Sequence, residues 1–244
     1  MASAEVSRDA FYLLMIFGGF FLSQFKGWRR SEVLWLLFAI LSITGLSLYW
    51  RDSPIAITAA ATGMMYTVLA GKGKSACFLF GFVNTPIYAY LSFRQGFYGD
   101  FALNVYYFIM MFVGLRTWVL HKSDLAEEGI SRTSLAAKGR LKLFAVCAVS
   151  TLGLYIVLHH LGGSRPLCDA MTNVLSIAAM YLTVRRAIEE WVLWIAVNAI
   201  EVFMWAKVWL SGEGMISVLL MWLLFLVNGI FILREWMRIN KKCV

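Results

Sequence analysis

The sequence has 244 residues, of which 61% are hydrophobic and only 15% are charged. A soluble globular chain carries about 45–50% apolar and about 25% charged residues, so a soluble core could not bury this much apolar surface. The net charge of +8 does not indicate a nucleic-acid-binding protein, because the basic residues lie between apolar runs rather than along one face. The composition predicts an integral membrane protein and excludes soluble enzymes, secreted disulfide scaffolds and disordered regulators.

The first apolar run, Ala10–Phe25, is short and contains Gly18 and Gly19. We interpret it as an interfacial or partly inserted helix. Eight longer runs follow, and each is long enough for a helix to cross about 30 Å of hydrocarbon. They are Glu32–Tyr49, Pro54–Ala70, Ser75–Phe93, Phe101–Leu120, Leu141–Leu161, Leu167–Val184, Trp191–Leu210 and Met215–Leu233. We therefore predict an all-α integral membrane fold with eight transmembrane helices.

Two groups of three spans resemble one another. Three short matches occur in the same order at similar spacing: Met65-Tyr66 with Met180-Tyr181, Asn84 with Asn198, and Leu115-Arg116-Thr117-Trp118 with Leu233-Arg234-Glu235-Trp236. One span lies between the groups, so both groups enter the membrane in the same direction. We interpret this as a 3+1+3 parallel repeat, an architecture that recurs in transporters and also occurs in channels and some membrane enzymes.

The repeat divides the chain into seven segments. They are an N-terminal segment with the interfacial helix (1–31), an extra N-terminal helix (32–50), repeat 1 (54–120), a cytoplasmic loop (121–140), a linker helix (141–161), repeat 2 (167–236) and a cytoplasmic tail (237–244). Of the 22 Lys and Arg residues, 18 fall on one side of these spans and 4 on the other. Basic residues accumulate in cytoplasmic loops, so both termini are expected in the cytoplasm.

Polar side chains in the seventh span form the strongest candidate site. Trp191, Trp194, Asn198, Glu201 and Trp205 follow the spacing of one helical stripe. Indole faces and an amide suit a flat, weakly cationic ring, which they can stack on and hydrogen bond. The first two tryptophans could instead belong to an interfacial aromatic belt.

The corresponding span of repeat 1 carries Phe80, Asn84 and Tyr88 on one face. Pseudo-symmetry would place Asn84 opposite Asn198, although an interhelical hydrogen bond is an equally good explanation for an intramembrane amide. Pro86 should kink the same helix, as a hinge or as a packing feature.

Enzyme chemistry lacks support in the sequence. Glu201 is the one clear mid-span carboxylate, and no second acid or histidine stands at a partner spacing. The cysteines and histidines do not have the spacing of metal ligands, so we predict no metal and no cofactor. Passive transport is favoured over a proton-coupled pump, which usually needs buried acids.

The tryptophan pair in Trp191-Val192-Leu193-Trp194, followed by Asn198, together with the eight spans and the parallel repeat, resembles the PnuC family of bacterial nicotinamide riboside transporters. The resemblance extends from about Ser31 to Trp236. It implies a fold like that of full-length SWEET transporters, assembled as a homotrimer in the bacterial inner membrane. It also implies facilitated diffusion of nicotinamide riboside, with trapping by a cytoplasmic riboside kinase.

By motif position, the resemblance places Trp191, Trp194 and Asn198 at the substrate, while Asn84, Tyr88 and Phe80 enter through the repeat. Glu201 could balance the charge of the pyridinium ring. Two alternatives stay open: a related carrier for thiamine, riboflavin or a deoxynucleoside, and a membrane enzyme or structural subunit.

Overall fold

The computed structural model describes residues 23–24, 26–51, 53–94, 98–121, 132–162, 165–211 and 216–240. Nearly all of the predicted helix Ala10–Phe25, most of the loop 121–140 and the end of the tail lie outside these residues. Among the described residues the chain is helical, apart from one isolated bridge between Thr133 and Ala187. The all-helical prediction is confirmed.

Eight long helices are described, one for each predicted span. They are α2 (Arg30–Tyr49), α3 (Pro54–Gly71), α4 (Cys77–Arg94), α5 (Tyr98–Leu120), α6 (Ala137–His160), α7 (Pro166–Arg185), α8 (Glu189–Leu210) and α9 (Ile216–Asn240). Helix α9 runs seven residues beyond the predicted end at Leu233, because Glu235 and Arg238 stabilise its last turns by an ion pair of 2.6 Å. The first residues of the predicted tail are therefore helical.

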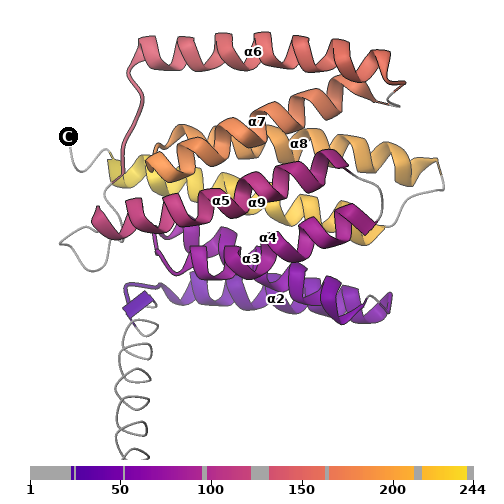
Figure 1. The fold of residues 1–244 in the computed structure, drawn as a ribbon. Helices are drawn as coiled ribbons and strands as arrows, with labels where there is room; N and C mark the ends of the chain where they lie inside the picture. The colour runs from indigo at the N-terminus through magenta and orange to yellow at the C-terminus, as the bar shows by residue number, and fades with distance from the viewer. Residues whose placement is uncertain are drawn as a thin grey trace, which may run out of the picture.

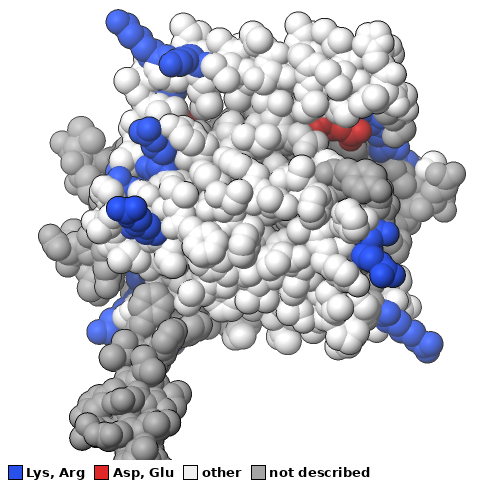
Figure 2. Space-filling model, viewed as in Figure 1, with Lys and Arg blue, Asp and Glu red and all other residues white. Residues whose placement is uncertain are grey.

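Five of the described helices have the length and hydropathy of a membrane span: α2, α5, α6, α7 and α9. Two shorter apolar stretches, Ile57–Gly71 and Cys77–Leu91, lie in α3 and α4. Helix α8 is also apolar for most of its length, with Glu201 and Lys207 as the charged residues that follow Trp191. The visible surface agrees with a bilayer setting, since Lys and Arg lie at the two sides of the molecule with a broad uncharged band between them (Figure 2).

The helices run side by side in alternating directions, with the start of α2 and the end of α9 on the same side (Figure 1). Six of them form a closed ring, in which α3 packs on α4, α4 on α5, α5 on α7, α7 on α8, α8 on α9, and α9 again on α3. Helix α2 lies outside the ring against α3 and α9, and α6 lies outside it, packed on α7 and joined to α8 by the ion pair between Arg140 and Glu189. The ring gives the fold an interior that six helices share.

Two buried tryptophans tie the ring together. Trp118 of α5 donates its indole N–H to the carbonyl of Thr183 in α7, at 2.9 Å, and Trp236 of α9 donates to the carbonyl of Gly71 in α3, at 2.6 Å. Both indoles are fully buried. Each bond thus joins the last helix of one group of three to the first helix of the other group.

The same tryptophans anchor the principal core. The Trp118 ring meets Phe78 of α4 edge-on at 5.0 Å, and the Trp236 ring meets Trp191 of α8 edge-on at 5.8 Å. Edge-to-face pairs at these separations are favourable beyond the area that they bury. The core therefore lies where α4 and α8 begin, at the end of the ring that carries the start of α2 and the end of α9.

Candidate functional site

Several aromatic side chains of helices α3, α4, α5 and α8 pack against this core and are only partly buried. We call Tyr66 of α3, Phe80 of α4, Tyr107 of α5 and Trp194 of α8 the aromatic cluster. The ring centroids of Tyr107 and Trp194 are 6.3 Å apart. Because its members come from both halves of the ring, the cluster lies where the two groups of helices meet.

Helix α7 supplies the polar partners of the cluster. The indole N–H of Trp194 approaches the hydroxyl of Thr183 at 3.4 Å, and this hydroxyl donates to the carbonyl of Ala179 at 3.0 Å. The Tyr66 hydroxyl reaches the sulfur of Met180 at 3.7 Å. The cluster therefore combines ring faces with a short row of polar groups, which suits a flat ligand with hydrogen-bonding edges.

Trp191 and Trp194 have different surroundings, although the sequence predicted one stripe. Trp191 is 3% exposed and belongs to the core, packed on Trp236. Its indole N–H is buried and has no hydrogen-bond partner. Trp194 is the half-buried member of the pair and the one that contacts the cluster.

The two predicted asparagines are engaged with different helices. Asn84 donates to the carbonyl of Ala59 in α3 at 2.6 Å, and its amide lies against Gly63. Asn198 is 7% exposed and lies beside Gly229 of α9. Helices α4 and α8 are not neighbours in the ring of described helices, and the placement of Asn84 opposite Asn198 at the repeat interface stays a prediction.

The remaining predicted residues are spread along the ring. Tyr88 is half-buried two turns beyond Phe80 on α4. Glu201 is also half-buried and interacts electrostatically with Asp100 and Asp169, which lie in the first turns of α5 and α7. Glu201 therefore lies toward the end of the ring opposite the core, away from the aromatic cluster.

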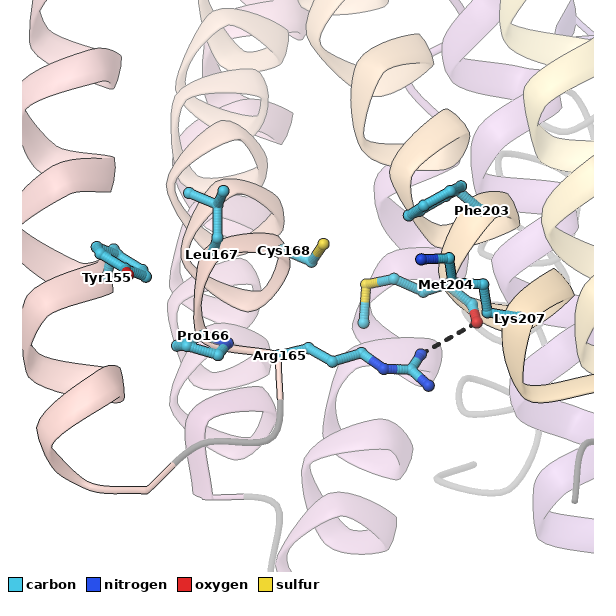
Figure 3. Close-up of a pocket in the computed structure, with 8 residues that line it drawn as sticks. All are labelled: Tyr155, Arg165, Pro166, Leu167, Cys168, Phe203, Met204 and Lys207. Carbon is cyan, nitrogen blue, oxygen red and sulfur yellow. Dashed lines mark hydrogen bonds between the residues drawn. The ribbon is translucent and has the colours of Figure 1, made fainter. Parts of the chain in front are cut away.

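Two surface pockets lie outside the ring interior. One, of about 360 Å³, opens between α6, α7 and α8, where Arg165 donates to the carbonyl of Met204 at 3.1 Å and Lys207 lies over the Phe203 ring (Figure 3). The other lies between α3 and α4, with Pro86 in its wall. None of the seven predicted substrate residues lines either pocket, so both are grooves between helices rather than the predicted site.

Glu190 is a candidate residue that lies outside the predicted spans, between Leu167–Val184 and Trp191–Leu210. It is the second residue of α8 and is fully buried. Neither of its carboxylate oxygens has a hydrogen-bond partner among the described residues, and Thr183 of α7, Tyr66 of α3 and Cys77 of α4 lie close enough to interact with it electrostatically. One signal could have found it, because Glu190 stands four residues before Trp194 and eight before Asn198, on one face of the helix.

A short segment before α6 covers the α7–α8 turn. The N–H of Thr133 donates to the carbonyl of Arg186, and the N–H of Ile188 donates to the carbonyl of Thr133, each at 2.9 Å. The Arg132 guanidinium lies 4.9 Å from the centre of the Trp236 ring. Burial in this turn lowers the pKa of the Arg186 guanidinium. The segment thereby closes the end of the ring next to Trp191.

A closed ring of apolar helices that carry buried and half-buried aromatic, amide and carboxylate side chains is typical of a multi-pass membrane transporter. Among the described residues no group of His, Cys, Asp and Glu could hold a metal ion. The comparisons with known proteins agree with this class. The profile of the nicotinamide mononucleotide transporter family matches residues 53–238, and the chain belongs to that family.

Named relatives are similar over most of their length. The nicotinamide riboside transporter PnuC of Neisseria mucosa is 34% identical over 223 residues, which cover 89% of this chain and 85% of that protein. The transporter of the same name from Haemophilus influenzae is 29% identical over 220 residues, covering 89% and 94%. A crystal structure of the vitamin B3 transporter PnuC superposes with a TM-score of 0.79 at 33% identity, covering 92% of this chain and 98% of that one.

Proposed function

We propose that this protein carries nicotinamide riboside across the bacterial inner membrane. The observation that carries the proposal is the aromatic cluster with Asn198 and a buried carboxylate inside the helix ring, in a chain whose relatives are named for this substrate. A nicotinamide ring is flat and positively charged when it bears ribose, so it is attracted to indole faces. The carboxamide and ribose hydroxyls need donors and acceptors, which amides provide.

The proposed site residues have separate roles. Trp194 stacks on the nicotinamide ring, and Trp191 completes that wall from the core side. Asn198 reads the carboxamide or the ribose. Phe80 and Asn84 with Tyr88 form the facing wall from α4, and Glu201 attracts the cation at the far end.

The proposed architecture is two parallel three-helix units in a SWEET-like ring, with α2 as the extra amino-terminal helix and α6 as the linker. All eight helices cross the membrane, and both termini are cytoplasmic. Two observations support the parallel units. The ring is closed by two like seams, α5 on α7 and α9 on α3, and each seam carries a tryptophan bond of the same kind. The count of 18 basic residues against 4 supports the orientation.

The proposed mechanism is facilitated diffusion by alternating access. The two units rock against each other along the seams, with Pro86 as a hinge within α4. Uptake becomes directional because a cytoplasmic kinase phosphorylates the riboside and traps it. The protein itself is not an enzyme in this proposal, and the resemblance to PnuC adds a homotrimer with one pathway in each protomer.

Calorimetry on the purified protein tests the substrate. We expect nicotinamide riboside to bind, and thiamine, riboflavin, a deoxynucleoside and free nicotinamide to bind far more weakly. Nicotinamide mononucleotide belongs in the same panel because the family profile bears its name. Selective binding of thiamine, riboflavin or a deoxynucleoside would favour the related carrier, and no binding by folded protein would favour the enzyme or structural subunit.

Flux into liposomes tests the mechanism. We expect the riboside to equilibrate across the bilayer without ATP or an ion gradient, and to accumulate only when a riboside kinase and ATP are enclosed. Full flux after the α5–α7 and α9–α3 seams are cross-linked would contradict the rocking motion. Accumulation that follows an imposed proton gradient in the absence of kinase would contradict facilitated diffusion.

A further inference from the structure

Glu190 is out of place for a residue with only a structural role. Its side chain is fully buried, and both carboxylate oxygens are without a hydrogen-bond partner. An isolated ionised carboxylate is among the most costly groups to bury, so buried acids are nearly always paired, hydrogen bonded or bound to a cation. The orphaned oxygens therefore indicate a ligand that the protein itself does not supply.

The nearest side chains cannot meet this need. The Thr183 hydroxyl is close enough to interact with Glu190, but it donates its one proton to the carbonyl of Ala179 at 3.0 Å, and the Tyr66 hydroxyl is directed at the sulfur of Met180. The Arg132 guanidinium interacts with Glu190 electrostatically, but it does not hydrogen bond the carboxylate and instead lies over Trp236. Among the described residues no side chain hydrogen bonds the Glu190 carboxylate, so a ligand inside the helix ring can take that place.

The neighbourhood of Glu190 describes that partner. Glu190, Trp194 and Asn198 occupy positions i, i+4 and i+8 of α8, so they form one row about 12 Å long. The row presents a carboxylate, an indole and an amide in that order, and Tyr66 of α3 interacts with the carboxylate from the other group of helices. A cation with a flat ring and polar substituents can engage all three members of such a row.

We propose that Glu190 is the counter-charge for the cationic ring of the substrate, with the positive charge held between the Glu190 carboxylate and the Trp194 indole. This inference rests on the proposed function and deepens it, because it names the residue that interacts with the positive charge of the nicotinamide ring. Glu201 lies on the same helix but toward the other end of the ring, where it interacts with Asp100 and Asp169. In this proposal Glu201 attracts the cation toward the ring of helices, and Glu190 recognises the positive charge inside it.

The assignment also has a consequence for selectivity. A carboxylate in a water-poor site attracts a cationic nucleoside and repels a phosphate group, since both charges act at reduced dielectric. Glu190 should therefore favour the riboside over its phosphorylated form and over the neutral free base. Glu190→Gln should therefore reduce the difference in affinity between the riboside and its phosphorylated form, and between the riboside and the free base.

The decisive experiment uses two ligands of nearly the same shape that differ in ring charge. Nicotinamide riboside carries the pyridinium charge, and reduced dihydronicotinamide riboside is neutral. Calorimetry on the full-length protein in detergent would measure both ligands with the wild type, with Glu190→Gln and with Glu189→Gln. Glu189 is the matched control because it lies next to Glu190 and forms an ion pair with Arg140 at 2.8 Å. Removal of a buried charge does not endanger folding, and a thermal unfolding midpoint verifies this for each variant.

We expect Glu190→Gln to weaken binding of nicotinamide riboside about tenfold and to change binding of the reduced riboside less than about twofold. Glu189→Gln should leave both affinities unchanged. Equal loss for the two ligands, or no loss for either, would overturn the role of Glu190 while binding of the riboside by the wild type upheld the proposed function. If the wild type bound neither riboside, the proposed function would fail and this inference would fail with it.

Discussion

Helices α4 and α8 hold corresponding places in the ring, and they differ in how their polar groups are satisfied. On α4, Asn84 donates to the Ala59 carbonyl at 2.6 Å, and the Thr85 hydroxyl donates to the carbonyl of Gly81 at 2.8 Å. On α8, both oxygens of Glu190 and the indole N–H of Trp191 are buried without a partner. These two polar side chains of α4 are hydrogen bonded within the protein, whereas these two side chains of α8 are not.

This difference shows how two similar groups of three helices can bind an asymmetric ligand. The seams, the two tryptophan bonds and the edge-on aromatic pairs are alike in the two halves. The chemistry offered to a ligand is concentrated on α8. Support and recognition are thus carried by different residues, and substitutions should separate them.

The largest effect is expected at Trp194. Trp194→Ala should weaken binding of nicotinamide riboside about 30-fold or more, because loss of a central aromatic anchor typically costs about 2 kcal/mol or more. Phe80→Ala, at the corresponding place on α4, should cost about threefold, since it offers a ring without a hydrogen-bonding edge. Calorimetry measures both, and equal losses would mean that the two helices contribute alike.

The two asparagines should separate binding from stability. Asn198→Ala is expected to weaken riboside binding about tenfold, through one lost hydrogen bond in a desolvated site. Asn84→Ala should instead lower the free energy of unfolding by about 1 kcal/mol, because its amide bonds to Ala59 within the protein. Binding isotherms and denaturation of each variant would be compared, and the reverse pattern would move recognition to α4.

The seam tryptophans test whether the frameworks are equivalent. Trp118→Phe and Trp236→Phe each keep a ring but remove the indole N–H that crosses to the other group. We expect each variant to lose about 1 kcal/mol of stability, to a similar extent. Thermal unfolding in detergent measures the loss. A much greater loss for Trp236 would show that the α9–α3 seam is the stronger one.

The smallest effect is expected at the glycines beside the asparagines. A Cβ at Gly63 would meet the Asn84 amide nitrogen at 3.0 Å, whereas a Cβ at Gly229 would meet the flexible Ile195 side chain at 3.2 Å and the Asn198 amide only at 4.0 Å. Gly63→Ala should destabilise the protein slightly, and Gly229→Ala should be nearly neutral because alanine favours helix by about 1 kcal/mol. Unfolding midpoints would rank them, and a greater loss at Gly229 would show tight packing around Asn198.

Hydropathy predicted the positions of the helices because burial in lipid is a property of local sequence. Hydropathy did not predict how each helix is rotated about its own axis, and the site differs from the prediction for this reason. Trp191 turns toward Trp236 while Trp194 reaches the aromatic cluster, and neighbouring helices decide this difference. The partner of Asn84 is a backbone carbonyl, which leaves no mark in the sequence.

Glu190 escaped prediction for a related reason. It follows Arg185-Arg186 and Glu189, and such a charged run normally marks a solvated loop. The α7–α8 turn is so tight, with Arg186 in the left-handed region at φ 62°, that α8 begins at Glu189 and brings Glu190 into the interior. Only the spacing from Trp194 and Asn198 hinted at this.

Helix α6 connects the two groups of three helices, so that one polypeptide can form the whole ring. Helices α3, α4 and α5 leave the chain at the opposite end of the bundle from where α3 began, and α6 brings it back so that α7 begins at the same end as α3 (Figure 1). Among the described helices α6 packs on α7 and reaches α8 through the ion pair of Arg140 with Glu189, so it takes no part in the two contacts that close the ring, α5 on α7 and α9 on α3. Helix α6 joins the two groups of three helices covalently, so both are made in one chain. Two separate chains inserted in the same direction would instead have to associate in the membrane.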